Sequence, residues 1–428
     1  MKKYLVVLRS IVLCALFFSF TAANPIEPIS IHAFTTDVLP NERDIDTEKI
    51  NHLYERKLEA AITAYFNKAI NKKQIIGAAI GVVKCDSIIY LGGFGKRKSS
   101  FSAEVDEETV FRIGSVSKGF AGILAGIHVE EGLLDWNSKI VEYIPNFQLS
   151  TNEITHEVTL SHVLSHTAGL PYHSYTNLVE NGVALEEIAS RFKQVKSISI
   201  PGEVYSYQNA AFALSGRMIE RVTGKKFSAI IKEKIFDPLE MHSASTDYKT
   251  LVNTSNIAYP HRKRYGRWKS VKINKKYYNN AIAAGGVNAS ITDMAKWMRF
   301  LLGNNQDVMS PMIMTEIFSP KIEVEGKSKY YQKWKKHESS YYGFGWRIHN
   351  FSDPIRGVSD KMIHHGGHVN SYRSEIAIFP TEDLGITVLF NSPTKLAQKV
   401  IPEIHAIVKE VMGIPKEEIL AESEALIL

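Results

Sequence analysis

The chain has 428 residues, of which 44% are hydrophobic and 22% charged, and its formal net charge is +6. This composition supports a substantial buried core with room for two subdomains, and no internal repeat or low-complexity segment is present. Because the chain has only two cysteines, core packing rather than a disulfide framework must stabilise it. These features predict a soluble globular protein.

The first 23 residues have the order of a secretory signal peptide. Basic residues up to Arg9 precede an apolar run at 11–18, and small residues end at Ala23. We expect cleavage after Ala23, which leaves Cys85 as a single free cysteine. The apolar run is short for a bilayer span of about 20 residues, so we predict a secreted or periplasmic protein without a stable span, with an uncleaved anchor as the alternative.

The next elements are a helix and a hairpin. Residues 24–49 form a leader segment, and apolar residues then recur at helical spacing over about 50–71. Two β-rich runs follow, Ile76–Val83 and Ile88–Phe94, separated by a short turn. They predict a β-hairpin.

Helical patterns dominate the middle of the chain, and strand patterns return towards its end. We expect strands at Gly345–His349, Ser374–Phe379 and Ile386–Phe390, and a last helix at about 396–412. Strands near both chain ends with helices between them predict an α/β fold of the α+β type. Its antiparallel sheet would have about five or more strands flanked by N- and C-terminal helices, beside an inserted all-helical subdomain.

We place the subdomain boundaries by these patterns. The discontinuous sheet subdomain would comprise 50–119 and 281–428, and the mainly helical subdomain 120–280. A cleft between two such parts is the usual place for an active site.

A hydroxyl and an amine lie three residues apart at Ser115 and Lys118, ahead of the small and apolar run Phe120–Ile127. Residues three apart on a helix share one face, so the amine can approach the hydroxyl. A lysine acts as a base only in its neutral form, which burial and neighbouring cations favour. Since the other S-x-x-K pairs, 190–193 and 392–395, lack this context, Ser115 is the candidate nucleophile and Lys118 its base; an N-cap serine is the alternative.

A phenol and a carboxamide follow at Tyr207 and Asn209, two residues apart at the start of another expected helix. Such a pair on a turn can point into one cleft. Tyr207 can then exchange protons with Ser115 and Lys118, and Asn209 can hold a substrate amide. The bare pattern also fits pairs at 175–177, 277–279 and 278–280, so only the position in the chain selects this one.

The third motif is His365-Gly366-Gly367-His368, ahead of the strand-like run 374–379. Glycines beside a histidine let a strand backbone approach a ligand closely, so that its N–H groups can bond to the ligand directly. One such N–H can complete an oxyanion hole. A structural role is the alternative for His365.

Together and in this order, the three motifs resemble the serine β-lactamase and penicillin-binding-protein superfamily. The similarity is to its class C-like branch, which includes DD-carboxypeptidases, class C β-lactamases and related esterases. Further stretches in register are Leu160–Pro171, Ala283–Val287 and Tyr342–Trp346, so the resemblance covers about residues 50–412.

The resemblance implies roles for the first two motifs. Ser115 would be the acylated nucleophile, Lys118 its proton partner and Tyr207 the general acid/base. Asn209 would bind the substrate amide. The implied reaction is acyl transfer through a covalent ester, followed by hydrolysis.

The resemblance also assigns the third motif. His365, Gly366 and Gly367 would bind substrate, and the backbone N–H groups of Ser115 and His368 would form the oxyanion hole. Class C β-lactamases have Lys-Thr-Gly at this motif, and an imidazole attracts a substrate carboxylate less strongly than a lysine. Ser371 is a second departure, because relatives often have glycine there.

These departures favour D-Ala-type peptides, or related amides and esters, over efficient cephalosporin hydrolysis. A class C-like β-lactamase or a broad carboxylesterase is the alternative. A penicillin-binding sensor that is acylated without turnover is a second alternative.

Metals and cofactors are not expected. His162 and His166 lie four apart, and His364, His365 and His368 crowd a loop, but no carboxylate completes a ligand set. We predict instead that His166 braces the turn leading to Pro171.

Two segments interleave basic and aromatic residues, at 262–278 and 327–336. Such segments can bind nucleic acid or anionic envelope polymers. We interpret them as solvated loop surface and expect no nucleic-acid partner, although a segment near the cleft could contact substrate. The expected partner is a small molecule or peptide, such as a peptidoglycan-like peptide, an ester or a β-lactam.

Overall fold

The computed structural model describes residues 42–353 and 358–419. The expected signal peptide and the leader up to residue 41 lie outside the described residues. No helix within the described ranges is long and apolar enough to cross a bilayer.

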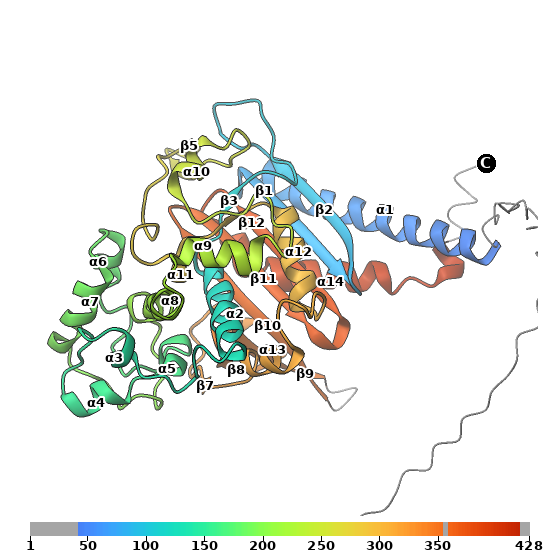
Figure 1. Ribbon diagram of the computed structural model, residues 1–428. Helices are drawn as coiled ribbons and strands as arrows, with labels where there is room; N and C mark the ends of the chain where they lie inside the picture. Colours follow the sequence, from blue (N-terminus) through green and yellow to red (C-terminus); the bar gives the residue numbers. More distant parts are fainter. Residues whose placement is uncertain (1–41, 354–357, 420–428) are drawn as a thin grey trace, which may run out of the picture. The chain divides into compact units, whose positions relative to one another are not determined.

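The described residues form an eight-stranded sheet in which every neighbouring pair is antiparallel (Figure 1). Its strands, in spatial order, are β2 (Ser87–Gly95), β1 (Gly77–Lys84), β12 (Leu384–Phe390), β11 (Tyr372–Phe379), β10 (Val358–Val369), β9 (Arg347–Asp353), β8 (His337–Tyr342) and β7 (Ile322–Glu323). Two small ribbons lie outside it, β3 (Phe111–Arg112) with β6 (Asn288–Ala289), and β4 (His261–Arg264) with β5 (Arg267–Ser270). The predicted antiparallel sheet is confirmed.

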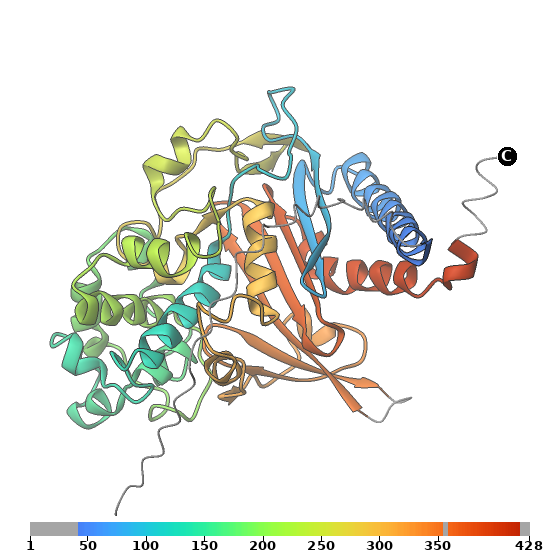
Figure 2. The ribbon, with the colours of Figure 1, turned by 45° about the vertical axis from the view of Figure 1, so that its right-hand side comes forward.

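Helices cover both faces of the sheet and also gather beside it (Figure 2). The α-helices are α1 (Glu42–Asn71), α2 (Ser117–Glu130), α3 (Ile140–Tyr143), α4 (Asn152–Glu157), α5 (Leu160–Leu164), α6 (Thr176–Glu180), α7 (Leu185–Arg191), α8 (Asn209–Thr223), α9 (Phe227–Ile231), α10 (Tyr248–Asn253), α11 (Ile282–Gly285), α12 (Ile291–Leu301), α13 (Pro311–Ile317) and α14 (Val400–Met412). The helices between α3 and α9 lie together at one side of the sheet (Figure 1).

The two faces of the sheet belong to different cores, as the two-residue period of a strand requires. In β1, Ala78, Ile80 and Val82 pack in one cluster with α1 and α14. The intervening Ala79 and Val83 pack in the other, with α2 and α12. The expected N- and C-terminal helices therefore share one face.

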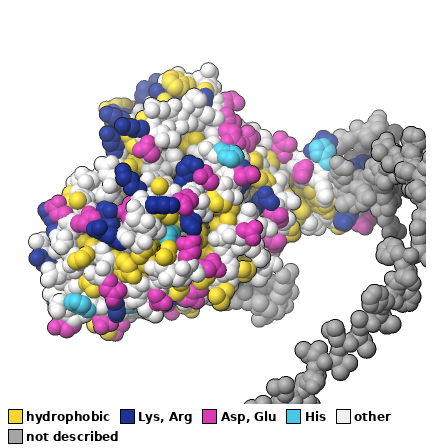
Figure 3. All heavy atoms as spheres, viewed as in Figure 1, with side chains coloured by type: hydrophobic (Ala, Val, Ile, Leu, Met, Phe, Trp, Pro, Cys, Tyr) yellow, Lys and Arg dark blue, Asp and Glu magenta, His cyan; other side chains and the backbone are white. Residues whose placement is uncertain are grey.

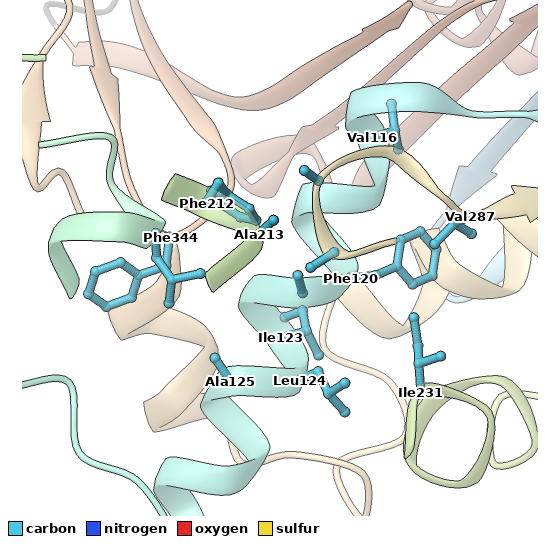
Figure 4. Close-up of a cluster of buried hydrophobic side chains, with 14 of the residues drawn as sticks. Val116, Phe120, Ile123, Leu124, Ala125, Phe212, Ala213, Ile231, Val287 and Phe344 are labelled. Atoms are coloured by element: carbon cyan, nitrogen blue, oxygen red, sulfur yellow. The ribbon is translucent and has the colours of Figure 1, made fainter. Parts of the chain in front are cut away.

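Helix α2 is buried from Ser117 to His128 because apolar and small residues surround it on all sides. Figure 4 shows Val116 at its start, and Phe120 and Leu124 within it, among side chains from other elements, such as Phe212 of α8. Full burial of one such large side chain stabilises the fold by about 1.5–3 kcal/mol. This packing holds the start of α2 in place.

Several predicted elements are confirmed and others differ. The hairpin of β1 and β2 turns at Cys85 and Asp86, both with positive φ, and Cys85 is a free, exposed cysteine. The first helix begins at Glu42 rather than 50, and the last begins at Val400, after a 3-10 turn. The boundaries of the two subdomains stay a prediction.

The prediction of a loop around His364–His368 is wrong, because these residues lie in the last part of β10. Glycine has low strand propensity, so the two glycines hid the strand from a sequence pattern. Pairing with β11 supplies the missing stability. The segment at 262–270, which we interpreted from the sequence as solvated loop surface, folds into the hairpin of β4 and β5.

Candidate functional site

Ser115 lies in a 3-10 turn, Gly114–Val116, directly before α2. Among residues 111–120 it is the one side chain that is not buried. Strand β3 leads into this turn, and the Ile113 N–H donates to the Val287 carbonyl at 3.1 Å. The chain therefore presents a single hydroxyl from an otherwise buried segment.

Lys118 reaches back to this hydroxyl from the first turn of α2. Its Nζ lies 3.4 Å from Ser115 Oγ, 2.8 Å from Asn209 Oδ1 and 2.7 Å from the Ala284 carbonyl oxygen. The side chain is fully buried, and burial holds its pKa well below the usual range, with a further lowering by the Arg347 charge. A neutral amine has two N–H bonds, which match the Asn209 and Ala284 acceptors, so its lone pair is left for the Ser115 hydroxyl.

Tyr207 approaches Ser115 from the segment before α8. Its phenol is close enough to the serine side chain for Ser115 to lower its pKa, and its ring centre lies 4.8 Å from Lys118 Nζ. Burial raises the pKa of Tyr207 to about 12, against the lowering effect of the Arg347 charge and of Ser115. Ser115 therefore contacts two groups that can accept or return its proton.

His166 supports the segment that carries Tyr207. Its Nδ1 accepts from the Gln208 N–H at 3.1 Å, its carbonyl accepts from the Ser206 N–H at 2.8 Å, and its ring lies 4.2 Å from the Tyr207 ring. Burial holds the pKa of His166 well below its usual range. His166 therefore supports the segment that carries Tyr207. Its predicted support of the turn leading to Pro171 stays a prediction.

Asn209 begins α8, and the protein occupies both ends of its carboxamide. Oδ1 accepts from Lys118, and Nδ2 donates to the Tyr277 hydroxyl at 3.3 Å and lies 3.4 Å from His173 Nδ1. Its side chain is buried. In this arrangement Asn209 orients the lysine amine, whereas the sequence indicated contact with a substrate amide.

The third motif lies at the end of β10, where that strand continues beyond the end of its pairing with β9. Pairing with β9 ends at His364, opposite Arg347, while pairing with β11 continues to Val369. From His365 onwards one edge of β10 is therefore unpaired with β9, and this free edge can bond to a ligand.

Two glycines let β10 and the serine turn touch. A Cβ on Gly367 would lie 2.0 Å from the Ile113 carbonyl oxygen. Gly114 has φ +54° and its Cβ would lie 2.9 Å from the His368 nitrogen. Because Gly114 precedes Ser115, the backbone amides expected to form the oxyanion hole belong to two segments in direct contact.

The His365 imidazole is buried, with both nitrogens bonded to protein atoms. Nδ1 lies 2.9 Å from the Gly366 carbonyl oxygen, so it carries the proton, and Nε2 accepts from the Tyr342 hydroxyl at 3.0 Å. Burial and the Arg347 charge hold the pKa of His365 well below its usual range. The ring is neutral at pH 7.

Arg347 is a charged group that sequence reasoning missed. Its guanidinium carbon lies 5.1 Å from the Tyr331 ring centre and 5.8 Å from that of Tyr342, and within the described residues no carboxylate pairs with it. The register of β9 against β10 places it one strand away from His365. Only the pairing of 347 with 364 could have revealed it.

A cavity of about 760 Å³ adjoins the site and shares Tyr207 and Arg347 with it. The segment 327–336 contributes to its wall, so the interpretation of that segment as solvated surface is wrong in part. Tyr331 and Trp334 are buried there, while Lys333 between them is exposed. The other basic segment forms the β4–β5 hairpin, and Figure 3 shows lysine and arginine side chains gathered at the upper left, where Figure 1 places β5.

Metal ligation has no candidate in the described ranges, which contain no cluster of three or more His, Cys, Asp or Glu suited to an ion. Both ring nitrogens of His364 are hydrogen-bonded within the protein instead. Nε2 lies 2.9 Å from Glu375 Oε2, and Nδ1 lies 3.2 Å from His349 Nε2.

Comparison with known proteins gives a family match along most of the chain. The β-lactamase family model matches residues 56–409. The solved structure of an octameric penicillin-binding protein homologue from Pyrococcus abyssi superposes with a TM-score of 0.69 at 23% identity, over 84% of this chain and 78% of that one. This likeness shows the fold.

Two curated relatives are similar in sequence. The unguisins hydrolase ungD of Aspergillus violaceofuscus is 23% identical over 403 residues, which are 88% of this chain and 67% of that protein. Protein flp of Staphylococcus aureus is 21% identical over 342 residues, 78% of this chain and 64% of flp. The chain thus spans about two thirds of the length of these relatives.

Proposed function

Because the chain belongs to the β-lactamase family, we propose that it is a serine hydrolase that transfers acyl groups through an ester on Ser115. One observation carries this proposal: the hydroxyl of Ser115, which is not fully buried, is in reach of both Lys118 and Tyr207. A nucleophile that contacts a base within hydrogen-bond reach is the general signature of covalent catalysis.

The proposed reaction uses the groups around Ser115. The Lys118 lone pair takes the Ser115 proton as Oγ attacks the acyl carbon, and the N–H groups of Ser115 and His368 receive the developing oxyanion. Loss of one such donor typically costs about 2.7–4 kcal/mol of transition-state stabilisation. Tyr207 donates its phenol proton to the leaving group and regains a proton from the Lys118 ammonium. Water then hydrolyses the ester with the same groups in reverse roles.

The preferred acyl donor is a D-Ala-type peptide or a related amide or ester. A neutral His365 supplies no charge for a substrate carboxylate, whereas Arg347 lies beside Tyr207 without a carboxylate partner in the described part of the chain. A terminal carboxylate on the leaving side suits this arginine. A class C-like β-lactamase or a broad carboxylesterase is the alternative, and the name of the relative ungD supports hydrolysis in general.

Export is part of the proposal. The order of basic, apolar and small residues up to Ala23 supports a cleavable signal. N-terminal sequencing of the protein from its native host should begin at Asn24; an intact Met1 on the exported or membrane-bound protein would contradict cleavage.

The activity test compares three substrate classes on the purified protein: a D-Ala-D-Ala peptide, p-nitrophenyl esters and a chromogenic cephalosporin. We expect turnover of the peptide or an ester, and its loss in Ser115→Ala. Ser190→Ala is the matched control, because Ser190 begins another S-x-x-K pair and its hydroxyl donates to the Glu187 carbonyl at 2.9 Å. A persistent penicillin adduct without turnover of any substrate would indicate a sensor instead.

A further inference from the structure

The cavity beside Tyr207, here called the lysine–tyrosine chamber, is bounded by Tyr207, Tyr331, Trp334, Lys333, Arg347 and Lys395. Its volume of about 760 Å³ lies within the range of pockets for small ligands and short peptides. Since Tyr207 lines the chamber and also lies close enough to Ser115 for that serine to affect its pKa, one molecule can occupy the chamber and reach the nucleophile.

Cations dominate the wall of the chamber. Lys329 and Lys399 complete a set of five with Lys333, Arg347 and Lys395, and no acidic side chain of the described residues lines the chamber. Lys399 pairs with Glu403 at 2.7 Å, which lies outside the lining. The other four have no carboxylate within 4.0 Å in the described ranges, so their charge is available to a ligand.

The wall that carries the lysines is anchored. Trp334 Nε1 donates to the Gln398 carbonyl at 2.7 Å, which joins the segment of Lys333 to that of Lys395. Tyr330 donates to Glu375 Oε2 at 2.8 Å. Glu375 is fully buried and also pairs with His364 and Arg373. Its carboxylate is therefore engaged by these partners beneath the wall, and it does not line the chamber.

Aromatic rings line the space between the cations. Lys329 Nζ lies 4.9 Å from the Tyr172 ring centre, and the Arg347 guanidinium lies 5.1 Å from that of Tyr331. Rings and amines together suit a chain that alternates apolar stems with anionic ends. A nucleic acid is less suited, because a pocket of this size holds only a short segment.

We propose that the lysine–tyrosine chamber binds an acidic segment of the acyl donor, so that the natural substrate is an acidic peptide with at least one carboxylate remote from the bond that is cleaved. This inference rests on the proposed function, because it takes the bound peptide to be the substrate of that reaction. It extends that function by naming the substrate class. The lysines act as charge-assisted donors to the remote carboxylates.

Binding without turnover tests the chamber. The full chain with Ser115→Ala is titrated into fluorescein-labelled triglutamate, triglutamine or trithymidylate, and fluorescence anisotropy reports affinity. We expect triglutamate to bind about tenfold or more tightly than triglutamine, with a loss at high salt. Equal affinity for the two peptides, or tighter binding of trithymidylate, would overturn the proposal.

Charge variants locate the site. Lys333→Gln with Lys395→Gln should weaken triglutamate binding about tenfold, because both lysines are exposed and contribute to the wall. Lys249→Gln removes a charge from an exposed position on α10 and should leave the affinity within twofold. An equal loss in both proteins would contradict the assignment.

The outcomes separate this inference from the proposed function. Ester hydrolysis that depends on Ser115, without preference for triglutamate, refutes the chamber alone. Preference for triglutamate without any acylation of Ser115 refutes the hydrolase alone.

Discussion

The Arg347 guanidinium carbon lies 5.9 Å from the centre of the Tyr207 ring. The register of the sheet causes this contact, because Arg347 pairs with His364 where β9 ends. Its charge lowers the pKa of Lys118 and opposes the rise that burial causes in the pKa of Tyr207. The Arg347 charge therefore favours both the neutral amine of Lys118 and the ionised form of the Tyr207 phenol, the two groups beside Ser115.

Replacement of Lys118 tests the base. Lys118→Ala should lower kcat by about 10²–10⁴-fold, because proton transfer from Ser115 loses its acceptor. Steady-state hydrolysis of a p-nitrophenyl ester measures the loss. Lys193→Ala, the exposed lysine of another S-x-x-K pair, is the control and should retain the wild-type rate; similar rates for the two variants would exclude Lys118 as the base.

Removal of the Arg347 charge should move the pH profile. In Arg347→Gln the pKa of Lys118 rises, because a like charge no longer disfavours its ammonium form. The neutral fraction at a given pH then falls, about tenfold for each unit of the rise, so the acidic limb of kcat/KM shifts to higher pH. Arg347→Lys keeps the charge and should keep the limb near the wild-type position. A limb that stays in place in Arg347→Gln would refute the coupling.

Replacing Asn209 by aspartate should also raise the pKa of Lys118. Asn209→Asp places an opposite charge where the amide oxygen lies 2.8 Å from Lys118 Nζ, which favours the ammonium and raises its pKa. Activity at pH 7 should fall and recover as the pH rises. Asn177→Asp, the exposed asparagine of the pair at 175–177, should show the wild-type profile. A fall without recovery at high pH would favour direct contact between Asn209 and substrate.

The contact between Gly114 and β10 should be visible in stability. Gly114→Ala combines the strain of a positive φ, about 1–3 kcal/mol, with a Cβ placed 2.9 Å from the His368 nitrogen. Gly224→Ala has a similar φ of +68° and nothing within 4 Å of the Cβ, so it measures the strain alone. Urea unfolding should show a larger loss of free energy for Gly114→Ala, together with a loss of hydrolysis confined to that variant. Equal losses would contradict the close approach.

Local spacing predicted the reach of Lys118 towards Ser115, because a helix fixes which residues share a face. The distant partners were inferred from their order in the chain, and the structure brings Tyr207 and the His368 backbone to the serine turn. The family assignment and the antiparallel sheet with its terminal helices are confirmed. The catalytic and binding roles stay predictions.

What the sequence could not reveal depends on pairing between strands. The end of β10 was mistaken for a loop because glycine has little intrinsic strand preference, and pairing with β11 makes it a strand. Arg347 was missed because its place beside Tyr207 depends on the register of β9. The hydrogen bond between Asn209 and Lys118 could not be predicted from the sequence either, because a carboxamide can face either a substrate or a neighbouring side chain.

Acylation of Ser115 is the central claim, and peptide-mapping mass spectrometry after rapid quenching tests it most directly. The purified protein is mixed with p-nitrophenyl acetate or benzylpenicillin, quenched and digested. We predict one acyl group per chain on the peptide that contains Ser115, absent in Ser115→Ala and retained in Ser190→Ala. An acyl group on another residue, or unchanged labelling of Ser115→Ala, would contradict the account.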